Sequence, residues 1–298
     1  KGMQGDDPRY LKLAATPKHF AAHSGPELDR HRFDVRVSER ELRETYLHAF
    51  EACVKVGKAA SVMGAYNRIN GEPCSASPFL LEKVLREEWG FDGYVVSDCL
   101  AIDDIFGGHR VTSSPAEAAA MAVNAGCDLE CGCAYGALGE ALERGLADES
   151  AIDRALARLF TARFRLGMFD PPEQVRYAEI PCESSDSSEH RALALQAARE
   201  SIVLLKNDAL PGEARPLLPL QHDLKSIAVI GPTAHRLAVL LGNYCGTPST
   251  WVTPLEGIVH KVSPATAVSY AQGCDIAPDM PALIQIPSGS LAEPVDGK

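Results

Sequence analysis

The sequence predicts an α/β fold in which four strand–helix units, corresponding to the carboxyl-terminal half of a (β/α)₈ barrel, precede the start of a second α/β domain. Short apolar segments that end in polar residues alternate with amphipathic helical segments over residues 13–168. The alternation stops at Asp170-Pro171-Pro172, and a polar cluster follows at residues 184–188. A closed barrel takes about 250 residues, so we expect its amino-terminal half to lie outside this chain.

The first two units occupy residues 13–89. The first apolar segment, 13–20, contains Lys18 and His19 near its end. Ser38 and Glu41 have the spacing of a capping box, which predicts a helix over residues 38–55. The second apolar segment is 60–66, and an amphipathic helix is expected at 78–89.

The third and fourth units, and the second domain, show the same alternation of apolar segments and amphipathic helices. The third apolar segment, 93–96, ends in Ser97 and Asp98 and precedes a helix at 115–125. The remaining expected elements are the strand 127–130, the helices 135–144, 151–168, 190–200 and 254–261, the strands 202–205 and 227–230, and a loop at 279–298. We therefore divide the chain into a partial barrel at 1–172, a linker at 173–196 and a second partial domain at 197–298.

The composition excludes several classes of partner. The chain has 298 residues and a net charge of −11 at pH 7, and it contains no Lys/Arg-rich segment. Negative charge repels phosphate backbones and anionic lipids, so we predict no nucleic-acid partner and no membrane partner. No apolar stretch approaches the roughly 20 residues of a membrane helix. Residues 1–7 lack the apolar core of a signal peptide.

The chain has nine cysteines, which are relevant to metal binding and to the cellular compartment of the protein. Cys127, Cys131 and Cys133 are close in sequence, but they do not form a C-x₂-C pair and no histidine lies at ligand spacing. We therefore predict no metal and no cofactor, and interpret these cysteines as small buried thiols or as part of a disulfide. A cysteine count this high favours a periplasmic or secreted location for the full-length protein.

Polar residues that close the apolar segments are the candidates for chemistry. The carboxyl ends of parallel barrel strands meet at one opening, so we expect Lys18, His19, Tyr66 and Asp98 to converge there. Asn67 and Ser97 close two of the same segments, and Asp128 and Glu130 close the fourth segment. A carboxylate beside a Lys-His pair and a tyrosine suits attack on a neutral acetal carbon, although an isolated strand-end Asp is equally suited to cap a helix.

Three of these segments, in the same order, resemble strands of glycoside hydrolase family 3. Gly93-Tyr-Val-Val-Ser-Asp98-Cys-Leu-Ala-Ile resembles the strand of the family's nucleophile, and Lys18-His19-Phe20 resembles its sugar-binding strand. Met63-Gly-Ala-Tyr66-Asn67 resembles the strand whose tyrosine contacts the nucleophile. The resemblance continues through Leu166–Pro171, Glu200–Asn207 and Ile227–Pro232, and so covers nearly the whole chain.

This resemblance implies a retaining β-glycosidase with a covalent glycosyl-enzyme intermediate. It implies that Asp98 is the nucleophile, that Lys18, His19 and Tyr66 bind substrate, and that the second domain is the family's α/β sandwich. The segments Ser24-Gly-Pro-Glu27 and Ser97-Asp-Cys99 are similar to the branch of exo-acting β-xylosidases and β-glucosidases. In that branch Arg30 matches a substrate-binding arginine. The implied partner is an oligosaccharide or an aryl or alkyl β-glycoside.

Two departures from the family pattern stand out. Leu100 occupies a position where the family usually has glycine or a small or polar residue, so we expect this side chain to narrow the site or to alter its aglycone preference. The acid/base glutamate of this branch is expected beyond Lys298. Glu256 and Glu293 are the late acidic candidates, and neither stands in that setting.

Three alternatives remain open. A β-N-acetylhexosaminidase of the same family would use Asp29 and His31 as its acid/base pair. A carbohydrate-binding or structural remnant would retain Asp98 for packing only. An aldolase-like barrel would use Lys18 as a Schiff base, which requires a desolvated lysine with a depressed pKa.

Overall fold

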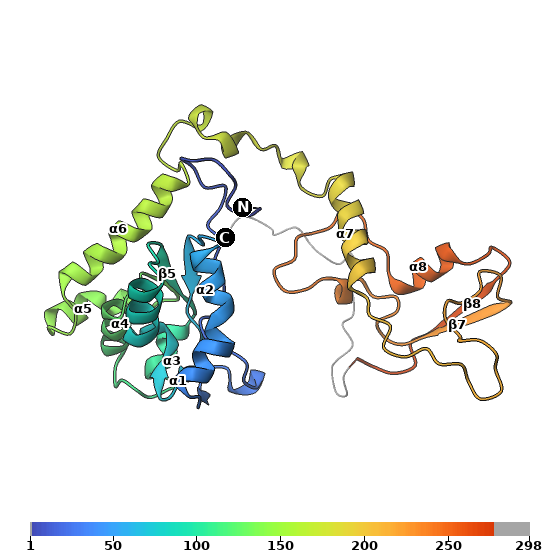
Figure 1. The fold of residues 1–298 in the computed structure, drawn as a ribbon, viewed down its shortest axis with the longest axis horizontal. Coiled ribbons are helices and arrows are strands. Elements are labelled where there is room, and N and C mark those ends of the chain that lie inside the picture. The colour runs from blue at the N-terminus through green and yellow to red at the C-terminus, as the bar shows by residue number, and fades with distance from the viewer. Residues whose placement is uncertain (1, 277–298) are drawn as a thin grey trace, which may run out of the picture. The chain divides into compact units, whose positions relative to one another are not determined.

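The computed structural model describes residues 2–276, and within them the chain forms two compact units with a boundary between Ile180 and Pro181 (Figure 1). Each unit contains parallel strands and helices. The α/β fold class predicted from the sequence is therefore confirmed. In the described residues the sheet of the first unit is open, and no closed barrel forms.

The first unit is organised around a parallel sheet with the strand order β2-β5-β6. Its strands are β2 (Ser61–Met63), β5 (Tyr94–Cys99) and β6 (Leu129–Cys131). The predicted strand at 13–20 pairs with the outer edge of β2, because Phe20 bridges Gly64 and the Ser61 N–H donates to the Ala15 carbonyl at 3.2 Å. Pro17 has no N–H group, which interrupts a regular ladder in this segment.

Helical segments follow the strands of this sheet. They are η1 (Glu27–Asp29), α1 (Glu39–Glu41), η2 (Leu42–Leu47), α2 (His48–Lys55), η3 (Cys74–Ala76), η4 (Phe79–Glu88), α3 (Ala101–Phe106), α4 (Pro115–Asn124), η5 (Ala134–Ala137), α5 (Leu138–Glu143) and α6 (Glu149–Arg165). Ser38 caps the first of the expected long helices by accepting from the Glu41 N–H at 3.1 Å, as predicted. A small sheet joins β1 (Asp34–Val35), β3 (Arg68–Ile69) and β4 (Glu72–Pro73).

Two apolar clusters hold the first unit together. The larger packs the sheet, including Val62 and Val95, against the helix η4 and against Phe20, and all of these side chains are fully buried. The smaller cluster lies between α4, α5 and α6 and consists mainly of alanines, such as Ala120 and Ala141. Alanine side chains let helix backbones approach closely without leaving voids. Large apolar side chains therefore pack the sheet against η4, whereas small side chains pack α4, α5 and α6 against one another.

A buried charge network connects the sheet to the helices. The Asp128 carboxylate accepts from Arg86 Nη2 at 2.9 Å, from Arg158 Nη1 at 2.8 Å and from the main-chain N–H of Val95 at 2.8 Å. The side chain of Asp128 is only 1% exposed, and burial is the largest cause that raises its pKa. This network ties the start of β5 to η4 and α6. Asp128 was a candidate for chemistry, but its partners give it a structural role.

The second unit contains a parallel pair of strands and two main helices. Its elements are α7 (Ser188–Ser201), β7 (Ser226–Ile230), η9 (Leu237–Leu240), α8 (Pro254–Lys261) and β8 (Ala267–Ala271), preceded across the boundary by the short helices η6 (Pro172–Gln174), η7 (Arg176–Glu179) and η8 (Cys182–Ser184). The predicted strand at 202–205 is wrong for the described residues, where this apolar segment is exposed and pairs with no neighbouring strand. A strand requires a partner for its backbone groups whatever its own propensity. The predicted loop at 279–298 and Glu293 lie outside the described residues.

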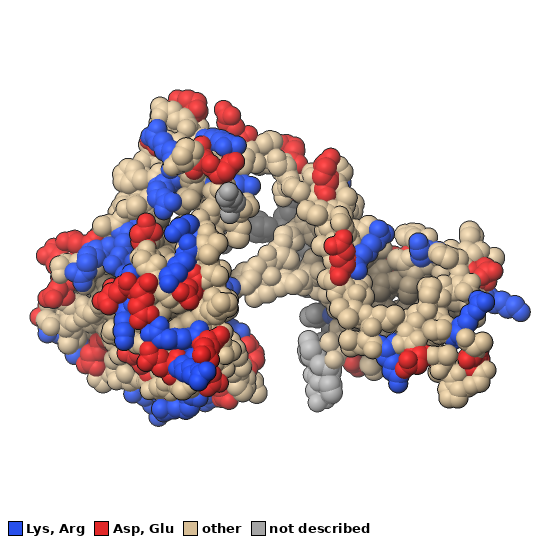
Figure 2. Space-filling model, in the orientation of Figure 1, with Lys and Arg blue, Asp and Glu red and all other residues tan. Residues whose placement is uncertain are grey.

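Charged side chains of both signs are interspersed over the visible face of the first unit (Figure 2). Several form ion pairs one helical turn apart, such as Arg40 with Glu44 and Lys55 with Glu51. Exposed pairs of this kind contribute little to stability, typically below about 1 kcal/mol each. The buried network of Asp128 is the electrostatic feature on which the position of β5 depends.

We predict that Asp128→Ala lowers the free energy of unfolding by about 3–5 kcal/mol, because it removes the nearest carboxylate from two partly buried guanidinium groups, those of Arg86 and Arg158. Urea denaturation monitored by circular dichroism measures this change. Glu140→Ala, which removes the exposed partner of Arg144, is the control and is expected to change stability by less than about 1 kcal/mol. Equal losses in the two variants would contradict the assigned role of Asp128.

Candidate active site

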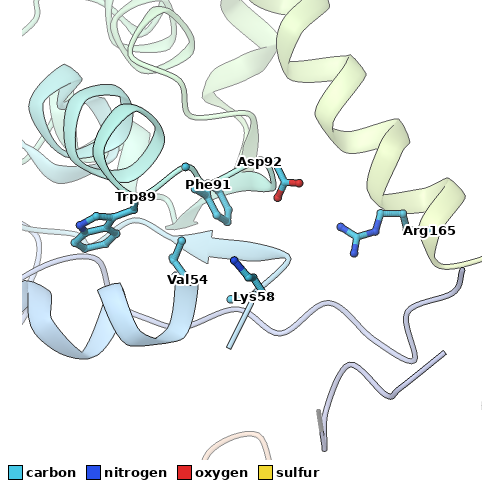
Figure 3. A pocket seen from close by; sticks show the side chains of 8 residues that line it. Val54, Lys58, Trp89, Phe91, Asp92 and Arg165 are labelled. Atoms are coloured by element: carbon cyan, nitrogen blue, oxygen red, sulfur yellow. The ribbon is translucent and has the colours of Figure 1, made fainter. Parts of the chain in front are cut away.

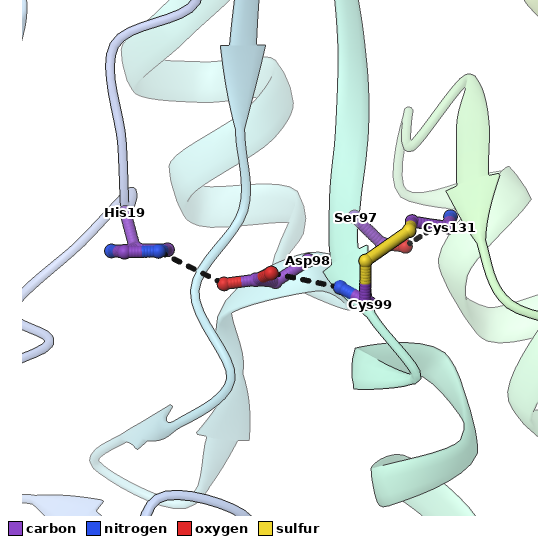
Figure 4. The surroundings of a disulfide bond; sticks show 5 residues. All are labelled: His19, Ser97, Asp98, Cys99 and Cys131. Atoms are coloured by element: carbon purple, nitrogen blue, oxygen red, sulfur yellow. Dashed lines mark hydrogen bonds and ion pairs between the residues drawn. A yellow bond between two sulfur atoms is a disulfide. The ribbon is translucent and has the colours of Figure 1, made fainter. Parts of the chain in front are cut away.

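Asp98 lies at the carboxyl end of β5, and its carboxylate is almost completely buried. Its Oδ1 accepts from the main-chain N–H of Cys99 at 2.8 Å. Its Oδ2 lies 3.0 Å from Nε2 of His19, which comes from the neighbouring segment at the edge of the sheet (Figure 4). One carboxylate oxygen is thus held by the backbone, and the other faces a side chain from a different strand.

His19 and Tyr66 both reach Asp98, as the sequence predicted. Burial lowers the pKa of His19, and the negative charge of Asp98 offsets this only in part. Burial and the charge of Asp98 raise the pKa of Tyr66 to about 12, so its hydroxyl stays protonated at neutral pH. Lys18 is exposed beside His19, and its positive charge contributes to the lowered pKa of His19.

Arg30 joins this group from the loop that follows the first strand. Its guanidinium carbon lies 5.4 Å from the centre of the Tyr66 ring, within the range of a cation–π contact. Arg30 pairs with Glu27 on the same loop, and this bond is the largest cause that raises the pKa of Arg30. The structure therefore brings Arg30, Tyr66, His19 and Asp98 to one end of the sheet.

A disulfide between Cys99 and Cys131 joins the ends of β5 and β6 directly beside Asp98 (Figure 4). Ser97 reinforces this link, because its hydroxyl accepts from the Cys131 N–H at 3.1 Å. The Leu100 N–H also donates to the Cys131 carbonyl at 2.6 Å. The backbone on both sides of Asp98 is thus attached to β6. The sequence left open whether Cys131 would form a disulfide, and its partner could not be read from spacing.

Leu100, the residue that departs from the family pattern, has a left-handed backbone with φ of 65° and a side chain that is 52% exposed. Leucine seldom adopts this conformation, and glycine adopts it without steric cost. Leu100 directly follows β5, so this exposed apolar residue lies two positions after Asp98 in the sequence.

The other polar residues that close the apolar segments have structural partners. Asn67 is buried, contacts His23 Nδ1 through Oδ1 at 3.0 Å and donates to the Ala21 carbonyl at 3.2 Å. Glu130 accepts from the main-chain N–H of Ala134 at 2.6 Å and so caps η5. Glu256 forms a capping box with Thr253 at the start of α8, and the hydrogen bond from the Thr253 backbone lowers its pKa. A general acid needs a raised pKa, so Glu256 is poorly suited to that role.

His31 and Asp29, the alternative acid/base pair, have different partners in the structure. His31 Nδ1 lies 2.8 Å from Oδ2 of Asp104, a residue of α3 that the sequence analysis did not select. Asp29 pairs instead with Arg32 at 3.2 Å. Helix α3 begins without a side-chain cap, so no local sequence pattern marked this helix or its residue Asp104. These contacts do not couple Asp29 to His31.

His109 is a buried histidine behind this group. Burial and the nearby charge of Arg68 lower its pKa to about 4, whereas the nearby backbone of Tyr66 acts in the opposite direction. His109 is only 6% exposed and remains neutral at pH 7. It therefore adds no positive charge beside the backbone of Tyr66 at neutral pH.

A separate hollow of about 330 Å³ opens at the opposite end of the sheet (Figure 3). Its lining includes Ala59, which precedes β2, and Asp92, which precedes β5, together with Lys58, Trp89 and Arg165. In parallel α/β barrels this amino-terminal end contributes stability, whereas the carboxyl-terminal end carries the chemistry. The hollow is thus distinct from the group around Asp98.

Two further observations concern metals and membranes. Among residues 2–276, no three side chains of the metal-binding types gather closely enough to hold an ion. Within the same part of the chain, none of the helices combines the length and apolar character needed to cross a bilayer.

The chain matches two family models. Residues 1–162 match the glycosyl hydrolase family 3 N-terminal domain, and residues 202–278 match the glycosyl hydrolase family 3 C-terminal domain. The chain is 42% identical over 283 residues to a xylan 1,4-beta-xylosidase of Xylanibacter ruminicola, covering 94% of this chain and 32% of that protein. It is 42% identical to a probable exo-1,4-beta-xylosidase of Aspergillus clavatus, covering 93% and 36%. The chain thus spans about a third of the length of these relatives.

Solved structures of β-xylosidases and β-glucosidases also align with most of this chain. An exo-beta-xylosidase in complex with a xylobiose aziridine probe aligns with a TM-score of 0.82 and 36% identity, covering 92% of this chain and 35% of that one. A beta-glucosidase from Listeria innocua in complex with glucose aligns with a TM-score of 0.74 and 31% identity, covering 89% and 35%.

The lowered pKa of His109 predicts a loss of stability in acid. The unfolded chain binds a proton at this histidine below its usual pKa of 6.5, whereas the folded chain does so only near 4. The free energy of unfolding should therefore decrease as the pH falls from about 6.5 to about 4, with His19 contributing in the same direction. In His109→Gln this decrease should be smaller, as measured by urea midpoints at pH 7 and pH 5. The control is His48→Gln, which changes an exposed histidine and should leave the loss of stability between pH 7 and pH 5 as large as in the wild type. A loss as large as that of the wild type in His109→Gln would refute this account.

Proposed function

This chain belongs to glycoside hydrolase family 3, and we propose that the protein containing it is a retaining, exo-acting β-glycosidase that hydrolyses terminal β-D-xylosyl or β-D-glucosyl residues. In this proposal residues 1–172 form the carboxyl-terminal half of a (β/α)₈ barrel. Residues 197–298 begin the α/β sandwich that follows it. The match of both family domains, in order along the chain, supports this arrangement.

The observation that carries the proposal is the setting of the Asp98 carboxylate. Its backbone-held Oδ1 and its buried position fix the group at the carboxyl end of β5, where barrel enzymes place reacting groups. In a retaining mechanism this carboxylate attacks the anomeric carbon and forms a covalent glycosyl-enzyme, which water then hydrolyses. Asp98 is the nucleophile in this scheme.

The neighbours of Asp98 supply binding and orientation. Nε2 of His19 lies 3.0 Å from the carboxylate, and Tyr66 offers a protonated hydroxyl close to it. Lys18 and Arg30 provide positively charged donors that suit the hydroxyl groups of a neutral sugar. These donors orient the sugar so that its anomeric carbon faces Asp98.

A second carboxyl group must protonate the leaving oxygen, because retaining glycosidases place an acid about 5–5.5 Å from the nucleophile. Glu256 caps a helix, and His31 is bonded to Asp104 rather than to Asp29. We therefore assign the acid/base role to a glutamate outside the described residues. This assignment distinguishes the proposal from the hexosaminidase alternative.

The relatives support a neutral oligosaccharide or aryl β-glycoside as the substrate. Curated relatives carry β-xylosidase names, and one solved relative was captured with a xylobiose-derived probe and another with glucose. No cofactor enters the scheme. The Cys99–Cys131 disulfide supports export to an oxidising compartment, either the periplasm or the extracellular medium.

We expect the full-length protein to release p-nitrophenol from aryl β-xylosides or β-glucosides, and Asp98→Ala to lower kcat by at least about a thousandfold, because the attacking group is lost. The matched control is Asp92→Ala, which alters an exposed aspartate next to the opposite end of the same strand and should leave kcat unchanged. Circular dichroism would verify folding. A folded Asp98→Ala protein with wild-type turnover would rule out this nucleophile.

A further inference from the structure

Residues 23–33, which we call the mouth loop, make three contacts with the ring of Tyr66. The ring of His31 lies 4.9 Å from it in an edge-to-face arrangement, the ring of His23 lies at 5.7 Å, and the guanidinium of Arg30 lies at 5.4 Å. Tyr66 in turn lies beside Asp98. The placement of the mouth loop therefore bears directly on the geometry of the site.

The mouth loop is attached to α3 by one short polar contact. His31 Nδ1 lies 2.8 Å from Oδ2 of Asp104, and since a carboxylate only accepts, Nδ1 is the donor. The side chain of Asp104 is only 13% exposed, while that of His31 is 52% exposed. The acceptor on α3 is therefore largely buried, and the donor on the mouth loop is half exposed.

A second feature shows that the loop and the end of α3 fit closely. A Cβ atom on Gly108 would lie 2.1 Å from the main-chain oxygen of His31, so only glycine permits this approach. Helix α3 begins at Ala101, three residues after Asp98. The element that receives the mouth loop is therefore connected to the nucleophile strand by a very short segment.

We propose that the His31–Asp104 pair is a positioning clasp, which fixes the mouth loop on α3 and thereby holds Arg30 and the ring of Tyr66 in place beside Asp98. The inference rests on the proposed function, since it assigns the clasp an effect on the glycosylation chemistry of that same site. Neither residue reacts with substrate in this account. They act by restricting the positions of Tyr66 and Arg30, and a displacement of about 1 Å in such groups can cost up to a hundredfold in rate.

The test compares three variants of the full-length protein with an aryl β-xyloside and an aryl β-glucoside. His31→Ala removes the donor and should lower kcat about tenfold or more. His31→Asn retains an N–H donor at the position of Nδ1 and should restore most of the lost rate. Arg32→Ala, on the same loop but outside the clasp, is the control and should retain wild-type kcat. If His31→Asn is as impaired as His31→Ala, or if only KM changes, the clasp is wrong.

Hydrogen–deuterium exchange gives a readout that does not depend on activity. Peptides covering residues 23–33 should exchange faster in His31→Ala than in the wild type, whereas peptides from α6 should not change. Equal exchange in the mouth loop would refute the clasp. An inactive wild-type protein would refute the proposed function, whereas an active wild type with unchanged kcat in His31→Ala would refute the clasp alone.

Discussion

The buried carboxylate of Asp128 determines where β5 lies, and the rest of the first unit depends on that position. It accepts from Arg86, from Arg158 and from the backbone of Val95, so one side chain joins β5 to η4 and α6. Two guanidinium groups and a backbone N–H satisfy the charge that burial would otherwise penalise. At the other end of β5, the disulfide of Cys99 fixes the strand to β6. Asp98 lies between these two attachments.

The candidate site combines a rigid component and a looser one. Asp98 is held by the backbone and by the disulfide beside it, whereas Tyr66 and Arg30 depend on side-chain contacts with the mouth loop. This division suits the proposed role of Asp98 as a nucleophile, which has to stay fixed while the proposed sugar substrate enters and leaves through the loops. His19 and Tyr66, although distant in sequence, both reach the carboxylate of Asp98 because they follow neighbouring parallel segments of the same sheet.

Much of this arrangement could be predicted from the sequence because it depends on local patterns. Apolar segments closed by polar residues located β2, β5 and β6, and the motifs around His19, Tyr66 and Asp98 selected side chains that do meet. The structure gave other roles to Asp128 and Glu130, since partners from distant helices, or from the next turn, satisfy their carboxylates. The same limit applies to the strand expected at 202–205, where propensity was present and a pairing neighbour was not. Asp104, its contact with His31, and the Cys99–Cys131 pairing are long-range contacts that no local pattern encodes.

In the proposed mechanism Asp98 forms a covalent bond to the sugar. Incubation of the full-length protein with a 2-deoxy-2-fluoro β-xyloside or β-glucoside, followed by proteolysis and mass spectrometry, tests it directly. The fluorine slows hydrolysis of the glycosyl-enzyme, so the account predicts that one fluorosugar accumulates on the peptide containing residues 93–102. Label on a different carboxylate, or a product that NMR shows to have inverted configuration, would contradict it.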